Sequence, residues 1–62
     1  MIKFHGAKVE FDDNGDKTYI DRGEVAIRKD AILAYYDHAI VLNRHTIYIM
    51  ETFGEIDAKL NQ

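Results

Sequence analysis

The sequence predicts an α+β fold, a small antiparallel β-meander of about five short strands with a C-terminal helix packed on the sheet. Three observations predict this class. Apolar and polar residues alternate in the first half of the chain, as they do in half-buried strands. The segment 32–50 is largely apolar and suits a second hairpin. A capping-box pattern at Thr52 then opens a helical spacing of apolar residues.

Residues 1–23 are predicted to form an N-terminal hairpin. The alternation runs from Ile2 to His5 and resumes from Val9 to Phe11. Gly6, between these two stretches, is expected to mark a bend or a bulge. Asn14-Gly15 is the strongest turn signal, because a two-residue type I′ turn needs positive φ at both positions.

Two lengths are compatible with this first turn. A two-residue loop at Asn14-Gly15 places Phe11 opposite Thr18. It also places Asp13 opposite Asp16, and like charges directly across a hairpin repel each other. That repulsion mildly favours a longer loop.

The central strands are expected within residues 24–50, after a second turn at Asp21-Arg22-Gly23. A short strand is predicted from Glu24 to Arg28, then a turn at Lys29-Asp30 and a strand from Ile32 to Tyr36. Asp30 could instead cap a helix, so whether residues 30–42 contain a helix stays open.

A second hairpin is predicted around a two-residue loop at Arg44-His45. That register pairs Ile40 with Ile49 and Leu42 with Ile47 on one face, and Val41 with Tyr48 on the other. Both faces are therefore apolar, whereas a small antiparallel sheet usually keeps one face polar. The second face can be covered in three ways: by the N-terminal hairpin, which would close a small barrel or sandwich, by a second subunit, or by a target protein.

The C-terminus is predicted as one helix over residues 52–60. Thr52 and Glu55 have the spacing of a capping box, which satisfies two amide donors at the helix start. Phe53, Ile56 and Leu60 fall on one side of the helix. So short a helix is unstable alone in water, so it is expected to dock on the sheet.

The composition indicates a single small domain, 1–62, of marginal stability. Chains this short usually gain stability from disulfides, a metal or a second copy. The chain has no cysteine, which excludes disulfides and thiolate metal sites and fits a cytoplasmic location. Its formal charge is −3, it shows no signal-peptide pattern, and its longest apolar run, Ala31–Tyr36, is too short to span a membrane.

Catalysis is not expected from these residues, and no cofactor is predicted. The chain contains neither serine nor cysteine, and Thr52 is better explained as a helix cap. Asp37 and His38 are adjacent, but neighbours on a strand point to opposite faces and form no dyad.

No metal site is predicted either. The three histidines are His5, His38 and His45, which are widely spaced in the sequence. Residues 12–16 have the spacing of the first ligands of a calcium loop, but Lys17 stands where that loop needs glycine.

The first turn carries an acidic tip, formed by Glu10, Asp12, Asp13 and Asp16. It is either a solvated turn or an anionic patch that docks on a basic groove of a protein partner and mimics nucleic-acid phosphates there. Small acidic inhibitors encoded by phages have a similar size and composition. The preferred hypothesis is therefore a non-enzymatic protein-binding module, a small inhibitor or regulator of phage or bacterial type.

The alternative hypothesis is a sheet surface that binds single-stranded nucleic acid. Four tyrosines and three basic residues could form a stacking platform. They are Tyr19, Tyr35, Tyr36, Tyr48, Arg28, Lys29 and Arg44. The net negative charge argues against this hypothesis.

Self-association is predicted, most simply as a homodimer. The chain is short, lacks a disulfide, and has an apolar face that the helix cannot cover. Val41, Tyr48 and Met50 are expected at the subunit contact.

From Val25 to Leu60 the chain resembles the short flagellar-operon FlbD-type proteins. The resemblance lies in the order of parts: an early strand, a turn with an Asp, a hairpin around 40–42 and 47–49, and Glu51-Thr52-x-x-Glu55-Ile56 leading into a helix. The family's usual Asn-Pro turn is missing, and the hairpin over residues 1–23 is extra. The resemblance implies a small non-enzymatic bacterial accessory protein.

Overall fold

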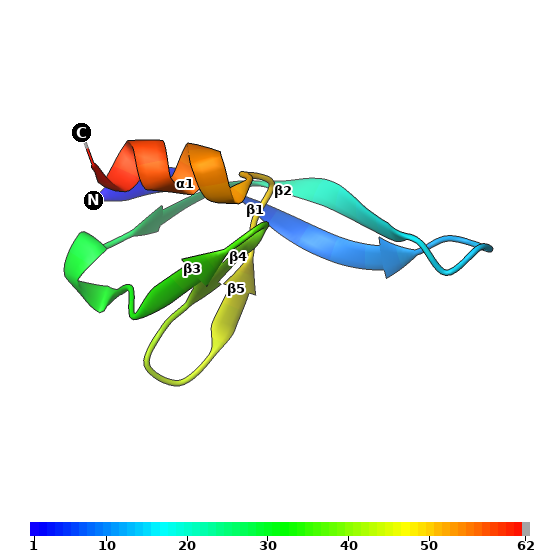
Figure 1. The fold of residues 1–62 in the computed structure, drawn as a ribbon, viewed down its shortest axis with the longest axis horizontal. Coiled ribbons are helices and arrows are strands. Elements are labelled where there is room, and N and C mark those ends of the chain that lie inside the picture. The colour runs from blue at the N-terminus through cyan, green and yellow to red at the C-terminus, as the bar shows by residue number, and fades with distance from the viewer. Residues whose placement is uncertain (62) are drawn as a thin grey trace.

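The computed structural model describes residues 1–61 and has the predicted α+β architecture, with five antiparallel strands and one C-terminal α-helix. The elements in chain order are β1 (Ile2–Phe11), β2 (Lys17–Ile27), a short 3-10 helix η1 (Lys29–Ala31), β3 (Ala34–Tyr36), β4 (Ala39–Val41), β5 (Thr46–Tyr48) and α1 (Phe53–Leu60). β1 and β2 form a two-stranded sheet, and β3, β4 and β5 form a separate three-stranded meander (Figure 1).

The N-terminal hairpin is longer than predicted, and a bulge divides it into two halves. Phe4 pairs with Val25 in the first half and Val9 pairs with Tyr19 in the second, with a register shift between His5 and Ala7. The bulge predicted at Gly6 is thus confirmed. The predicted turn at 21–23 is wrong, because β2 continues to Ile27 and absorbs an extra residue near Gly23, whose φ is 99°.

The first turn is a five-residue loop, so the predicted type I′ turn is wrong. Gly15 has φ of 82° but Asn14 does not have positive φ. The backbone amide of Asp12 donates to the carbonyl of Asp16 at 2.9 Å, and Asp12 Oδ1 accepts from the amides of Asn14 and Asp16. This geometry is that of a type I turn followed by a left-handed glycine. It separates Asp13 from Asp16 and pairs Phe11 with Lys17.

The three-stranded sheet has the predicted order but not the predicted register. Ile40 pairs with Ile47, and residues 42–45 form a four-residue loop closed by a hydrogen bond of 2.8 Å from the Leu42 amide to the His45 carbonyl. The expected two-residue loop at Arg44-His45 is therefore wrong, since this pair lacks residues that favour positive φ. The register differs by two positions, so each side chain keeps its predicted face.

The hydrophobic core lies on one face of the three-stranded sheet. Its buried members come from both sheets and the helix: Phe4, Ile27, Ile40, Ile49, Ile56 and Leu60. The base of the hairpin and α1 therefore cover the same face. An isolated bridge between Gly6 and Ile49, and a hydrogen bond from the Met50 amide to the His5 carbonyl, connect the two sheets.

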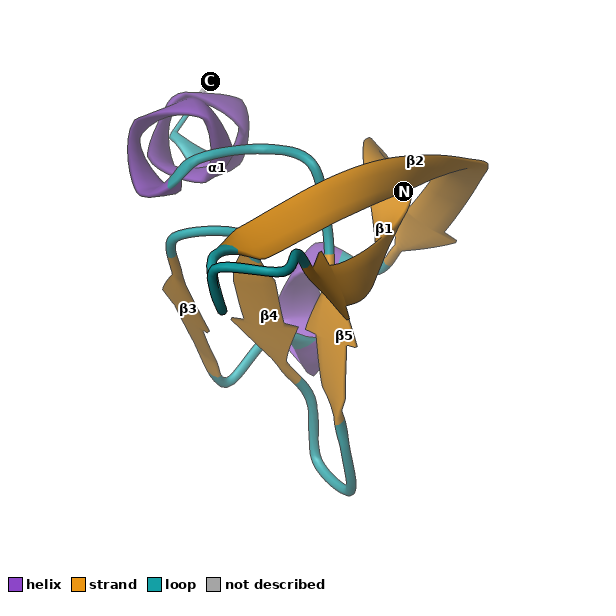
Figure 2. Ribbon diagram, turned by 90° about the vertical axis from the view of Figure 1, so that its right-hand side faces the viewer, coloured by secondary structure: helices purple, strands orange, loops and turns teal. Residues whose placement is uncertain are grey.

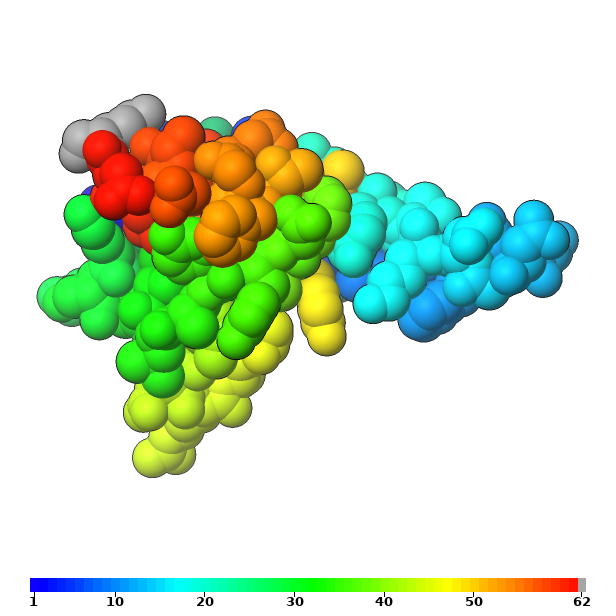
Figure 3. All heavy atoms as spheres, in the orientation of Figure 1, coloured from blue at the N-terminus to red at the C-terminus, as the bar shows by residue number. Residues whose placement is uncertain are grey.

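The far half of the hairpin projects away from this core. We call residues 7–21 the arm; Figures 1 and 3 show it extending from the rest of the molecule. The molecule measures 38 × 24 × 19 Å and exposes 4495 Å². A typical monomer of this mass exposes roughly 4,100 Å². The excess follows from a projection that buries no residue completely. No helix in the described part of the chain is long and apolar enough to cross a membrane.

Candidate functional site

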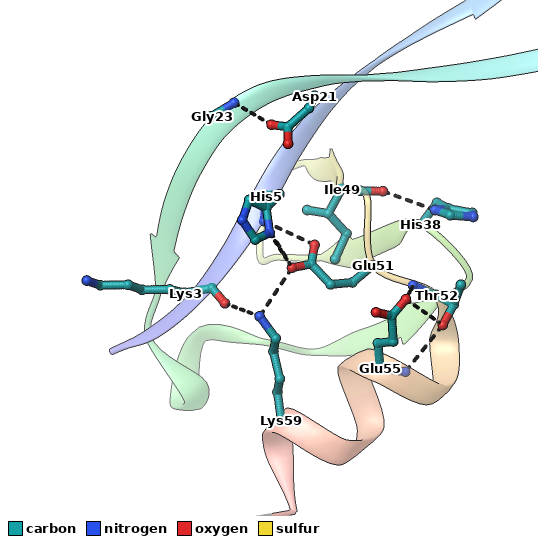
Figure 4. Close-up of polar contacts among 10 residues, drawn as sticks. All are labelled: Lys3, His5, Asp21, Gly23, His38, Ile49, Glu51, Thr52, Glu55 and Lys59. Carbon is teal, nitrogen blue, oxygen red and sulfur yellow. Dashed lines mark hydrogen bonds and ion pairs between the residues drawn. The ribbon is translucent and has the colours of Figure 1, made fainter.

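A buried carboxylate, Glu51, lies where the two sheets and the helix meet. Glu51 is only 5% exposed and follows β5 directly. Its two carboxylate oxygens accept the backbone amide of His5 at 3.0 and 3.2 Å. One of them also contacts His5 Nδ1 at 3.0 Å and Lys59 Nζ at 3.2 Å (Figure 4). One side chain thereby ties β1 to α1.

The charges of this cluster support each other. Burial by itself raises the pKa of the Glu51 carboxyl, but hydrogen bonds from His5 and Lys59 outweigh it and hold that pKa below its usual 4.5. The hydrogen bond to Glu51, and then its negative charge, raise the pKa of the His5 imidazole above 6.5. Lys59 Nζ also donates to the carbonyl of Lys3. The carboxylate is therefore ionised and fully engaged inside the protein.

The Asp37-His38 turn between β3 and β4 is the second junction. Asp37 Oδ1 accepts the amide of Phe53 at 2.7 Å, so it satisfies the first amide of α1. His38 donates its amide to the carbonyl of Glu51 at 3.1 Å and has φ of 59°, which is uncommon outside glycine. Its ring stacks on Tyr19 with centroids 4.1 Å apart, which anchors the near end of the arm.

The helix start confirms the predicted capping box. Thr52 Oγ1 accepts the amide of Glu55, and the Glu55 carboxylate accepts the amide of Thr52. Together with Asp37, these groups accept the amides of Thr52, Phe53 and Glu55 at the beginning of α1. Ile56 and Leu60 are buried as predicted, whereas Phe53 is half-exposed and stacks on Tyr35.

The cluster has the composition of a structural anchor. Each donor around Glu51 comes from the chain itself, and no buried side-chain nitrogen or oxygen within residues 1–61 lacks a partner. The same residues contain no group of three metal-ligating side chains. In the calcium-like segment, Asp12 Oδ1 is already used by two loop amides.

The acidic tip lies at the far end of the arm. All four of its carboxylates are exposed, and Phe11, which follows Glu10, is 66% exposed. A large apolar side chain therefore stands among carboxylates at the end of a projection.

The three-stranded sheet presents its other side to solvent. We call this side the outer face; by strand alternation it consists of Ala34, Tyr36, Ala39, Val41, Thr46 and Tyr48. None of these residues is charged, and Tyr36 and Tyr48 are 61% and 49% exposed. Figure 2, viewed from the side to which the arm points, shows β3, β4 and β5 uncovered below the hairpin.

Two of the three residues predicted for self-association share this outer face. Val41 and Tyr48 lie on it, on neighbouring strands. Met50 lies apart from them, because it lines a hollow with His5, Glu51 and Lys59. The N-terminal hairpin does not cover the outer face, so the predicted alternative of a closed barrel or sandwich is not what the chain forms.

The tyrosines are not gathered into one platform. Tyr19 stacks on His38, and Tyr35 donates its hydroxyl to Asp57 at 2.7 Å on the core side. Only Tyr36 and Tyr48 share the outer face.

Sequence reasoning missed Glu51 and the capping role of Asp37. Glu51 stands just before the capping box, where a carboxylate is normally taken for a solvated residue near the helix start. A signal was available in the pattern, since Glu51 continues the alternation of β5 past Met50 into the junction. The partners of Asp37 are 16 residues away in sequence, which no local pattern indicates.

Comparison of the chain with protein-family models, with curated proteins and with solved structures gives no match. The resemblance to FlbD-type proteins therefore stays a prediction.

Proposed function

We propose that this chain is a non-enzymatic protein-binding module, an inhibitor or regulator that acts by occupying a surface of a partner macromolecule. Its binding surfaces are the arm and the outer face. The observation that carries the proposal is the arm, a stretch of 15 residues, 7–21, that contributes no fully buried residue to the fold.

A projecting two-stranded hairpin has a physical cost. Such a hairpin is marginally stable by itself, because it lacks a third strand or a packed layer. Within the arm only Ala7, Val9 and Tyr19 are half-buried, and Tyr19 is held by stacking on His38. The remaining residues of the arm are exposed in the monomer. A partner that packs against the arm supplies the missing layer.

The outer face supports the same function. Exposed aromatic residues without neighbouring charges are typical of the cores of protein interfaces and are less common on other protein surfaces. Tyr36 and Tyr48 meet this description. The acidic tip adds charge that can orient a basic partner during association.

The junction at Glu51 supports a structural role for the ionisable residues. A general base must reach a substrate, but the Glu51 carboxylate is enclosed and hydrogen-bonded by His5 and Lys59.

Binding of single-stranded nucleic acid is the second candidate, favoured by the two exposed tyrosines of the outer face. The absence of Lys or Arg among the six residues of that face makes it the weaker one.

The experiment is affinity capture from an extract of the cells that make the protein. The chain is immobilised as wild type, as Phe11→Ser with Tyr48→Ser, and as Ile20→Ser. Ile20 is 42% exposed and pairs with Lys8, on the arm face opposite to Phe11, so it is a matched control.

A binding protein retained by wild type and by Ile20→Ser, but lost with the double variant, supports the proposal. Retention by all three chains, or by none, overturns it. Oligonucleotide binding that weakens with salt and depends on Tyr36 and Tyr48 would instead support the nucleic-acid candidate.

A further inference from the structure

We infer that the arm and the outer face bind a second copy of this chain, in an interlocked antiparallel dimer. In this dimer the two outer faces meet at the twofold axis, and each acidic tip lies in a hollow at the opposite end of its partner. The inference rests on the proposed function, because it assigns an occupant to the same surfaces.

The hollow that receives the tip lies between η1 and the β4–β5 loop; we call it the basal hollow. It has a volume of about 410 Å³. Its lining combines three apolar residues with four polar ones: Ala31, Leu33 and Leu42, and Asp30, Asn43, Arg44 and His45. Leu33 is 65% exposed there. Among residues 1–61, no side chain of the same molecule fills this space. A single aromatic side chain, such as Phe11, fits it in size and in polarity.

The charges of the two ends are complementary. Between Lys8 and Lys17 four carboxylates outnumber two lysines, which leaves the tip negative. The basal hollow itself is lined by one acid, Asp30, and one base, Arg44. Arg28 and Lys29 line the neighbouring hollow beside Met1, and Arg28 pairs with Asp30, so the bases of this end outnumber its acid and leave it positive. An exposed phenyl ring at the negative end therefore matches a partly apolar hollow at the positive end.

The shape of the molecule allows both contacts at once. In Figure 1 the arm ends at one extreme of the long axis, and the β4–β5 loop and η1 lie toward the other. Figure 3 shows an open angle between the arm and the lobe that carries the three-stranded sheet. In a pair of molecules related by a twofold axis, the lobe of each molecule enters the open angle of the other. Each arm then runs past the partner's sheet toward the partner's β4–β5 loop. A closed isologous pair of this kind does not polymerise.

The surface available is appropriate for a small dimer. Phe11, Tyr36 and Tyr48 are 66%, 61% and 49% exposed. At about 200 Å² for a whole aromatic side chain, these three expose on the order of 350 Å². A standard interface buries about 800 Å² on each partner, so three rings supply nearly half. The uncharged outer face also avoids like-charge repulsion between two chains that each carry −3.

Charge reversal with rescue tests this arrangement. The tip variant is Glu10→Lys with Asp13→Lys, which leaves Asp12 and its loop hydrogen bonds intact. The hollow variant is Lys29→Glu with Arg44→Glu. Glu24→Lys, outside both surfaces, is the control for a change of charge. Sedimentation equilibrium measures the dimer dissociation constant of each chain, of an equimolar mixture of the two variants, and of the chain with all four substitutions.

We expect a dimer for wild type and Glu24→Lys, and a dissociation constant raised by at least about tenfold for the tip variant and the hollow variant alone. The equimolar mixture and the fourfold variant restore association, because opposite charges again meet at both contacts. A wild-type chain that stays monomeric, variants that associate like wild type, or a mixture without rescue overturns the inference. Should the chain stay monomeric while a different protein is captured through Phe11 and Tyr48, the proposed function stands and only the second copy is excluded.

Discussion

The imidazole of His38 stacks on the ring of Tyr19, with centroids 4.1 Å apart and planes inclined by 21°. This contact joins the β3–β4 turn to the arm, and it lies between the core and the projecting residues. The direction of the arm therefore depends on a ring-on-ring contact, not on buried aliphatic side chains. His38 is itself held by backbone hydrogen bonds to Glu51 and Ile49, so the arm is indirectly connected to the backbone of the residue that carries the buried carboxylate.

Tyr19→Ala should loosen the arm and leave the core intact. An aromatic pair contributes roughly 0.5–1.5 kcal/mol beyond burial of its area, so local opening of the arm should become up to about tenfold more frequent. Residue-resolved amide exchange measures it: the amides of residues 7–11 and 17–21 exchange faster, whereas those of Ile40 and Ile56 do not. Tyr19→Phe keeps the ring and should behave as wild type. Equal acceleration throughout the chain would contradict a local role.

Glu51→Gln should destabilise the whole fold. The amide replaces an acceptor with a donor that faces His5 and Lys59, and hydrogen bonds to charged groups contribute about 2 kcal/mol each when broken in a buried setting. Chemical denaturation gives the free energy of unfolding. Glu24→Gln is the matched control, because its ion pair with Lys3 is exposed and should contribute less than about 1 kcal/mol. Equal stability of the two variants would show that the Glu51 junction is not an anchor.

Stability should be greatest between about pH 4.5 and 6.5, the usual pKa values of the two groups in the His5–Glu51 pair. His5 has a raised pKa in the folded state, so its contribution is complete below 6.5 and is lost as pH rises through the raised value. Glu51 has a lowered pKa, so its contribution is present above 4.5 and is lost as pH falls through the lowered value.

Thermal unfolding across this pH range measures the effect. Replacing His5 with Phe should remove the decrease in stability on the alkaline side, whereas His45→Phe, in the exposed β4–β5 loop, should preserve it. A decrease that persists without His5 would assign the titration to another group.

Asp37→Ala should lower stability by about 1 kcal/mol, the usual contribution of a side chain that caps a helix start. The amide of Phe53 loses its acceptor, and the first turn of α1 frays. Asp37→Asn retains a side-chain oxygen and should lose less than half as much. Helical circular dichroism at low denaturant, together with the unfolding midpoint, distinguishes fraying from global loss. If Asp37→Ala matched wild type, Thr52 and Glu55 alone would be sufficient to cap α1.

Local patterns predicted the elements of the fold better than the connections between them. The alternation around Phe4 and Val9, the capping box at Thr52 and the bulge at Gly6 depend on residues a few positions apart, and all three are confirmed. The predicted loop conformations were wrong where two different turns are compatible with the same residues. Asn14-Gly15 suits a type I′ turn and equally a type I turn with glycine in the left-handed position, and the hydrogen bonds of Asp12 decide between them.

The candidate site was harder to predict, because its contacts join distant segments. Glu51 binds His5, 46 residues away, and no periodicity indicates that pairing. The uncovered outer face was predictable in part. Val41 and Tyr48 were predicted to share a face, and they do share it, because a register shift of two residues keeps every side chain on the same face of its strand. Met50 was placed with Val41 and Tyr48, but the chain leaves β5 after Tyr48 and the amide of Met50 bonds to His5 of β1, so Met50 does not lie on the outer face.

Amide exchange measured at low and at high protein concentration tests the central claim, that the arm and the outer face bind a second copy of this chain, most directly. We predict that protection in the arm, and in β3 and β5 at the edges of the sheet, increases with concentration. Protection of core amides such as those of Ile40 and Ile56 should increase only as far as mass action stabilises the whole fold. Protection that is independent of concentration throughout residues 7–21 would contradict self-association through these surfaces.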